Sequence, residues 1–166
     1  MEYTVRKDNQ FKRMYQGANM LYTYISEEYT LEKLVKKFFN IREYSNEYVK
    51  EFKEQAVKQT KEFTSFVSNI IREKISGNQA CYRYAGALQA IFEKISIKSD
   101  IVIGLACPEN MKSKQFGDSS IENLINKVSV NHVWVETSNK VYESFNGEVD
   151  NLYHVFGDKV QMIGGE

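Results

Sequence analysis

Apolar residues recur every three or four positions through the first part of the chain, as they do along one face of a helix. The first such stripe covers residues 11–25. Thr30 can cap a second, short helix, and a third, long helix is expected over residues 46–75, with one polar gap near Gln59. The pattern therefore predicts that residues 1–76 are almost wholly helical.

The helical period continues from Cys81 to Ile95, and then the pattern changes. A continuous apolar run over residues 101–106 is typical of a buried central strand. Alternating apolar and polar positions predict several strands beyond residue 129. The later elements expected are a loop over 108–118, a short helix over 121–128, strands over 130–137, 141–145, 153–156 and 159–163, and turns at 138–140, 146–147 and 157–158.

Helices in the first half, followed by one more helix and an antiparallel meander of strands, place the chain in the α+β class. We expect N-terminal helices and then a helix bearing Cys81 that packs on an antiparallel sheet. The chain has 166 residues and no Pro/Ser-rich linker. These features predict a single domain over residues 1–166, with a helical region over 1–76 and a core over 77–166.

Composition and charge narrow the class of protein. Hydrophobic residues make up 42% and charged residues 27%, and the formal net charge is zero, as in ordinary soluble globular proteins. Because no basic excess is present, nucleic acid is not an expected partner. Two cysteines, Cys81 and Cys107, are too few for a disulfide framework or a cysteine metal site. We expect reduced thiols, a structural role for Cys107, and neither metal nor cofactor.

The first residues lack the apolar segment of a secretory signal, and no apolar run approaches the ~20 residues of a membrane span. We therefore expect a cytoplasmic protein with no membrane partner, although an effector exported by a route other than Sec would have the same sequence features. Nothing in the sequence indicates an oligomeric state.

Candidate chemistry begins at Cys81, which follows a turn and opens an apolar-periodic helix. A free thiol has a pKa near ~8.5, and both a helix N-terminus and a neighbouring imidazole favour the thiolate. His132 stands at the head of an alternating strand and can supply that imidazole. We expect Cys81 in the first turn of its helix, with its sulfur about 3 to 4 Å from a ring nitrogen of His132.

A third group must hold the imidazole, and two residues of the next strand are candidates. If the hairpin loop comprises residues 138–140, His132 lies opposite Asn146. If the loop comprises residues 138–139, Glu143 becomes the diagonal neighbour of His132 on the same face. Both alternatives stay open, Asn146 being preferred, and Asn146-Gly147 is also typical of a plain turn.

Two segments carry a resemblance to a known family. The run Cys81-Tyr-Arg-Tyr-Ala-Gly-Ala-Leu and the later strand His132-Val-Trp-Val-Glu resemble the core of the transglutaminase-like superfamily, a branch of the papain-like cysteine enzymes. Cys81, His132, Trp134 and Glu136 match the family's pattern position by position. The resemblance covers roughly residues 77–150.

The resemblance implies a papain-like fold and a cysteine nucleophile that needs no cofactor. The sequence departs from the family at the third catalytic position. The family has an Asp-Pro pair on the strand after the histidine, and Asn146-Gly147 stands in its place here. An asparagine serves this purpose in the papain-like proteases, so the departure still allows the expected chemistry.

Further residues are expected near the site. Gln79 is a candidate for the oxyanion site or for a turn, and the backbone N–H of Cys81 is the safer oxyanion donor. Tyr82 is a candidate for the wall of the cleft or for packing. Trp134 shares the face of His132 and is expected to pack under the site.

These residues predict a cysteine hydrolase or acyltransferase that acts on an amide bond of a protein or peptide substrate. A protease or deamidase is expected rather than a cross-linking transglutaminase, because nothing marks an amine site. One alternative is a non-enzymatic binding protein on the same fold with a degenerate triad. Another is an interaction protein that uses the long helix over residues 46–75.

Overall fold

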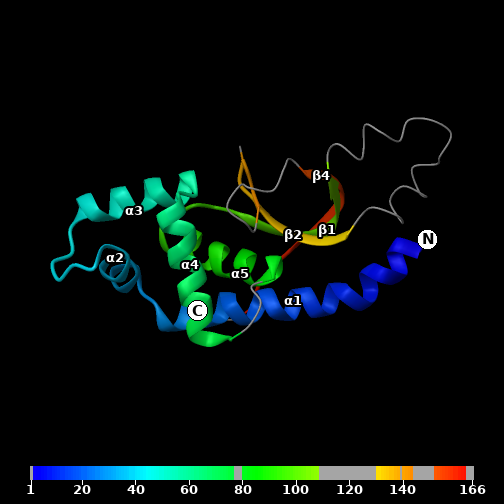
Figure 1. Cartoon of the computed structure of the whole chain (residues 1–166), viewed down its shortest axis with the longest axis horizontal. Coiled ribbons are helices and arrows are strands. Elements are labelled where there is room, and N and C mark those ends of the chain that lie inside the picture. The colour runs from blue at the N-terminus through cyan, green and yellow to red at the C-terminus, as the bar shows by residue number, and fades with distance from the viewer. Residues whose placement is uncertain (1, 77–79, 109–129, 139, 144–151, 164–166) are drawn as a thin grey trace.

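The computed structural model describes residues 2–76, 80–108, 130–138, 140–143 and 152–163 (Figure 1). Within these residues the chain forms five helices and four strands, so the protein is α+β, as the sequence predicts. The helices and strands are α1 (Glu2–Glu28), α2 (Leu31–Phe39), α3 (Asn46–Lys58), α4 (Lys61–Lys74), α5 (Cys81–Lys94), β1 (Asp100–Pro108), β2 (Val130–Glu136), β3 (Val141–Tyr142) and β4 (Leu152–Val160).

The first four helices confirm the helical prediction, because no described residue before Asp100 lies in a strand. Two of these helices begin at a threonine cap. The Thr30 hydroxyl accepts a hydrogen bond from the backbone N–H of Lys33 at the start of α2, and Thr60 accepts one from Phe63 at the start of α4, both at 3.1 Å. Each cap satisfies an N–H group that the helix itself leaves without a partner.

The prediction of one long helix over residues 46–75 is wrong, because the chain turns sharply between α3 and α4 (Figure 1). Gln59 adopts a left-handed conformation, with φ at 51°, and its N–H bonds to carbonyls of the last turn of α3. Thr60 then starts α4. The turn brings Phe52 of α3 against Phe63 of α4, with ring centroids 5.7 Å apart. The polar gap in the apolar stripe therefore marks a break between two helices, and this break allows the two rings to pack.

Helix α5 lies between α1 and the sheet (Figure 1). Gly86 of α5 faces the backbone of Ala18 in α1 so closely that a Cβ would come within 2.0 Å of the Ala18 carbonyl oxygen. Gly17 of α1 is likewise covered by the ring of Tyr82. The two glycines therefore allow the close approach of the helices that fixes the direction of α5.

The sheet has the strand order β3-β2-β1-β4, and all its pairs are antiparallel. β1 is central, and residues 101–105 are buried, which confirms the prediction of a buried central strand. The predicted meander is wrong in its last step, because β4 crosses to pair with β1 instead of β3. β4 also runs unbroken through Gly157 and Asp158, where the sequence predicts a turn.

Packing around Gly157 explains why β4 continues through this residue without a turn. A Cβ at this residue would come within 2.5 Å of Val102 and 3.0 Å of the Trp134 ring. The glycine is therefore needed because two neighbouring side chains cover it, and it continues the ladder opposite Gly104.

The two faces of the sheet differ in the residues that they carry: one face belongs to the main hydrophobic core, and the other carries the residues that alternate with it along β2. Val133 and Val135 of β2 belong to the main hydrophobic core, and Tyr142 of β3 packs edge-on against Phe92 of α5, with centroids 5.1 Å apart. Because neighbouring residues of a strand point to opposite faces, the residues that alternate with these valines lie on the other face. The expected packing of the Cys81-bearing helix on an antiparallel sheet is thus observed.

Candidate active site

Cys81 is the first residue of α5, as the sequence predicts. The N-cap residue is Ala80, which has no side chain that could bond to the first N–H groups of the helix. The thiol is free and partly buried. It therefore stands at the positive end of a 14-residue helix, where an anion is stabilised.

His132 lies in β2 and is 9% exposed. Its Nε2 donates a hydrogen bond to Oε1 of Glu143 over 2.7 Å, and Cys81 is close enough to the ring to raise its pKa. Gly104 is its partner across β1 and carries no side chain. The structure thus brings together a thiol, an imidazole and a carboxylate from three separate segments.

These contacts change the pKa of the imidazole. Burial on its own would lower the pKa of His132, because a charged ring loses its hydration. Hydrogen-bonding and electrostatic interactions with Cys81 and Glu143 outweigh burial and raise the pKa of His132 to about 9. The ring is therefore an imidazolium at neutral pH.

The register of the β2–β3 hairpin explains why Glu143 is the partner. Val141 pairs with Glu136, Tyr142 pairs with Val135, and the N–H of Thr137 donates to the Lys140 carbonyl at 2.8 Å. This is the shorter-loop register of the two considered from sequence. It makes Glu143 a diagonal neighbour of His132 on the same face. Asn146, the preferred candidate at the sequence level, lies outside the described residues.

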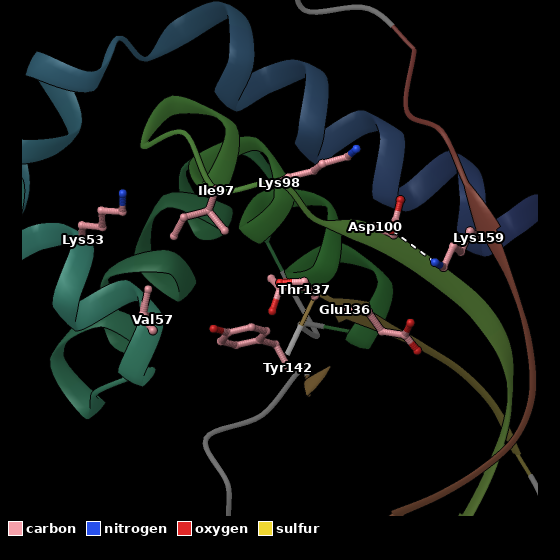
Figure 2. A pocket seen from close by; sticks show the side chains of 10 residues that line it. Lys53, Val57, Ile97, Lys98, Asp100, Glu136, Thr137, Tyr142 and Lys159 are labelled. Carbon is pink, nitrogen blue, oxygen red and sulfur yellow. Dashed lines mark ion pairs between the residues drawn. The ribbon is translucent and has the colours of Figure 1, made fainter. Parts of the chain in front are cut away.

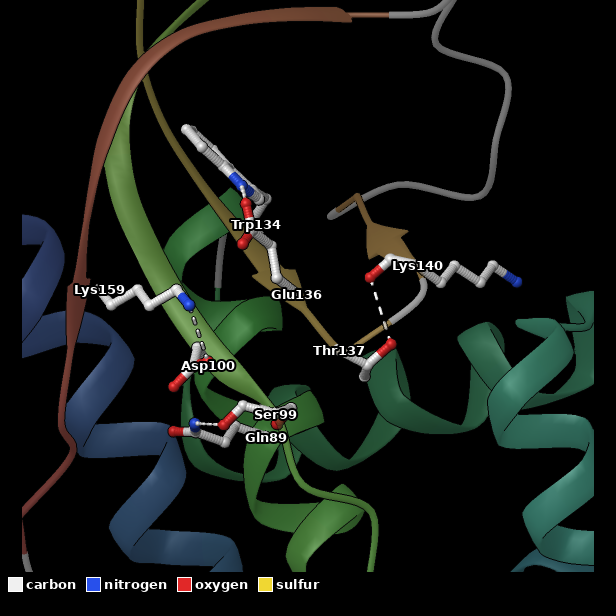
Figure 3. A network of polar contacts seen from close by, with 8 residues as sticks. All are labelled: Gln89, Ser99, Asp100, Trp134, Glu136, Thr137, Lys140 and Lys159. Carbon is white, nitrogen blue, oxygen red and sulfur yellow. Dashed lines mark hydrogen bonds and ion pairs between the residues drawn. The ribbon is translucent and has the colours of Figure 1, made fainter.

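Trp134 is stacked on His132, with ring centroids 5.7 Å apart and an angle of 24° between the planes. It is 2% exposed, so it packs beside the imidazole as predicted. Its indole N–H donates a hydrogen bond to Oε2 of Glu136 over 2.9 Å (Figure 3). Sequence reasoning missed this contact, although the i, i+2 spacing along a strand puts both side chains on one face.

The remaining predicted residues lie in different places. The ring of Tyr82 covers Gly17 of α1, and the Arg83 guanidinium lies 5.6 Å from the centre of that ring. Tyr82 therefore packs between α5 and α1. Gln79 lies outside the described residues. Cys107 lies in β1, opposite Tyr153 of β4.

A pocket of about 580 Å³ opens at the other end of β2 (Figure 2). Glu136, in the wall of this pocket, is four positions along β2 from His132, which is about 13 Å along a strand. Tyr142 and Val57 give the pocket an apolar side, and Lys159 pairs with Asp100 at 3.5 Å. The lining residues are Lys53, Val57, Ile97, Lys98, Asp100, Glu136, Thr137, Ser138, Tyr142 and Lys159.

Among the residues that the structure describes, no three His, Cys, Asp or Glu side chains come together as metal ligands. In the same part of the chain, every helix is too short or too polar to cross a bilayer.

The chain matches no protein-family model, no curated protein and no solved structure. The interpretation of the site therefore depends on its own geometry.

Proposed function

We propose that this protein is a cysteine hydrolase or acyltransferase that acts on an amide or peptide bond of a protein or peptide. One observation carries the proposal. His132 lies beside Cys81, which stands at a helix N-terminus and raises the pKa of the ring, and it is hydrogen-bonded through Nε2 to the carboxylate of Glu143. This is the nucleophile, base and orienting group of a catalytic triad.

In the first half of the proposed reaction, Cys81 attacks as a thiolate whose proton is already on the imidazolium of His132. Glu143 occupies Nε2, so the ring nitrogen left for this proton is Nδ1. The thiolate sulfur attacks the carbonyl carbon, and the carbonyl oxygen takes the negative charge. The backbone N–H of Cys81, the first residue of α5, is a candidate donor to that oxygen. When the C–N bond breaks, the imidazolium gives its proton to the leaving amine, and a thioester remains.

In the second half, water attacks the thioester while His132 accepts a proton from it. The C–S bond breaks, the carboxylic acid leaves, and Cys81 is again a thiolate beside the imidazolium of His132. An amine in place of water would give acyl transfer. No described residue forms an evident amine site, so hydrolysis, by proteolysis or deamidation, is the favoured outcome. The steps need no metal or organic cofactor.

Glu143 also bears on the resemblance to the transglutaminase-like superfamily. That family has a carboxylate on the strand after the histidine. A carboxylate from the segment that follows β3 bonds to His132 here. We therefore propose a Cys81-His132-Glu143 triad of this type, with glutamate in place of the family's aspartate.

The rate of Cys81 alkylation tests the proposal. Iodoacetamide should modify Cys81 at neutral pH much faster than an ordinary thiol, as followed by mass spectrometry of the peptide that contains it. His132→Ala and Glu143→Ala should each slow the reaction. Asn146→Ala distinguishes this triad from the papain-like alternative, in which the asparagine holds the ring, and should slow the reaction less than Glu143→Ala does. A rate for unmodified Cys81 no higher than that of an ordinary thiol would overturn the proposal.

A second candidate is a binding protein on the same scaffold. The observation that favours it is the position of the 580 Å³ pocket, whose lining includes neither Cys81 nor His132. Three lysines and two carboxylates in this lining suit a polar ligand. Slow alkylation of Cys81 together with ligand protection of the Lys53 and Lys98 amines would favour this second function.

A further inference from the structure

We propose that Trp134 and Glu136 are positioning residues for His132: Glu136 fixes the indole, and the indole fixes the plane of the imidazole and favours its charged form. This inference rests on the proposed function. It goes beyond the triad because neither residue touches Cys81 or Glu143 in any described contact.

The contacts form a short chain along β2. Oε2 of Glu136 accepts the indole N–H of Trp134 at 2.9 Å, and the indole ring stacks on His132 with an angle of 24° between the planes. The hydrogen bond to Glu143 and the interaction with Cys81 hold the edge of the His132 ring, but they leave the ring free to tilt about the line that joins these two partners. The stack with Trp134 restricts that tilt.

The other side of the indole is held as well. The distal ring atoms of Trp134 lie over Gly157 in β4, close enough that a Cβ there would come within 3.0 Å of them, and Val102 lies beside them. The indole is 2% exposed. The indole is therefore held between β4 at its distal ring atoms and Glu136 at its N–H. These two contacts restrict how far the indole can move relative to His132.

The stack also has an electrostatic effect. A cation over the face of an indole is stabilised by the ring's electron density, and the imidazolium of His132 is such a cation. The other charged groups that face this ring in the described structure are Cys81 from α5 and Glu143 from the segment after β3. Gly104, opposite on β1, contributes no charge. Loss of the stack should therefore lower the pKa of His132, and loss of the fixed ring plane should lower the reactivity of Cys81.

Asp100 provides a matched control for the replacement of Glu136. Asp100 is its direct partner across β1, lines the same pocket and pairs with Lys159, yet it makes no described contact with Trp134 (Figures 2 and 3). Replacing Asp100 therefore changes the same charge at the same end of the sheet. Only replacement of Glu136 removes the acceptor of the indole N–H.

The experiment compares Glu136→Ala, Glu136→Gln, Trp134→Phe and Gly157→Ala with the Asp100→Asn control. Two quantities are measured on each folded protein: the rate of Cys81 alkylation at pH 7, and the pKa of His132 from NMR titration of its ring. We expect Glu136→Ala and Trp134→Phe to slow alkylation by about three- to tenfold and to lower the pKa of His132. Glu136→Gln keeps an acceptor oxygen and should restore most of the rate.

Gly157→Ala presses on the indole from β4 and should act in the same direction without altering any group of the triad. The double variant Glu136→Ala/Trp134→Phe should lose no more than Trp134→Phe alone, because both act through one ring. Asp100→Asn should match the unmodified protein.

The outcomes separate this inference from the proposed function. If Cys81 of the unmodified protein reacts quickly but the Glu136 and Trp134 variants react equally quickly with an unchanged His132 titration, the positioning inference fails and the triad stands. If Cys81 of the unmodified protein is slow, the proposed function fails. The same result in Glu136→Ala as in Asp100→Asn also overturns the inference, because a shared charge effect would then explain both.

Discussion

The helical region buries a cluster of phenylalanines, whereas the face of the sheet that carries His132 buries groups that can be charged. Ring centroids within the cluster of Phe38, Phe52, Phe63 and Phe66 lie 5.1 to 6.4 Å apart. In the second region a 9% exposed histidine carries two polar contacts.

The two regions differ in what their buried side chains contribute: the phenylalanines contribute stability, whereas the buried histidine suits a functional site. Burial of aromatic rings is favourable in any orientation, so the phenylalanine cluster stabilises the fold without specifying chemistry. A buried imidazole costs free energy unless its nitrogens are bonded. A chain that nonetheless buries one beside a thiol and a carboxylate has the feature expected of a functional site.

The sharpest test of this comparison is Cys81→Ala. We expect the variant to lose all hydrolytic activity and to keep its thermal unfolding midpoint within a few degrees, because the thiol is only partly buried. Activity is measured on a peptide or amide substrate found with the unmodified protein. Cooperative unfolding lost together with activity would show that Cys81 is a structural residue and would break the comparison.

The converse change is made in the phenylalanine cluster. Phe63 is fully buried, and Phe63→Ala should lower the free energy of unfolding by about 3–5 kcal/mol, because it leaves a cavity. Urea titration followed by circular dichroism measures the loss. The folded fraction should retain the alkylation rate of Cys81. A slower rate in the folded fraction would show that the two regions are coupled.

Glu143→Gln should have a smaller effect on stability, and that effect should depend on pH. The pKa of His132 is raised to about 9 from an ordinary value near ~6.5. Stabilisation from the charged ring is therefore fully present below about pH 6.5 and is lost as the pH rises through about 9. We expect a cost of about 1–3 kcal/mol at pH 6.5.

Urea titrations of the unmodified and Glu143→Gln proteins between pH 6 and 10 check this expectation. The difference in unfolding free energy should shrink toward the alkaline end. A difference that stays constant across this range would mean that Glu143 does not interact with a charged His132.

The smallest effect is expected at the edge of the helical region. The Tyr29 hydroxyl donates to Glu73 at 2.5 Å, and Lys37 pairs with the same carboxylate at 2.9 Å, but this carboxylate is 36% exposed. Tyr29→Phe should therefore cost less than about 1 kcal/mol, as measured by the same titration. A cost as large as that of Phe63→Ala would show that polar contacts, and not the aromatic cluster, stabilise this region.

The local pattern of the sequence is enough to predict the helices, the central strand and the place of Cys81 at a helix start. These features depend on residues close together in the chain: the apolar period fixes the buried face, and Thr30 fixes where α2 begins. The family resemblance pointed to Cys81 and His132 as partners. The alternation of side chains along the strand also predicted that Trp134 would lie on the face of His132.

Tertiary structure decided the rest. The break at Gln59 follows from the packing of Phe52 on Phe63, and the course of β4 through Gly157 follows from Trp134 lying over that glycine. The choice of Glu143 as partner of His132 depends on the hairpin register, in which a loop of one more residue would have brought a different side chain opposite. Each of these features depends on contacts between residues far apart in sequence, or on a shift of one position between strands, and a local pattern contains neither.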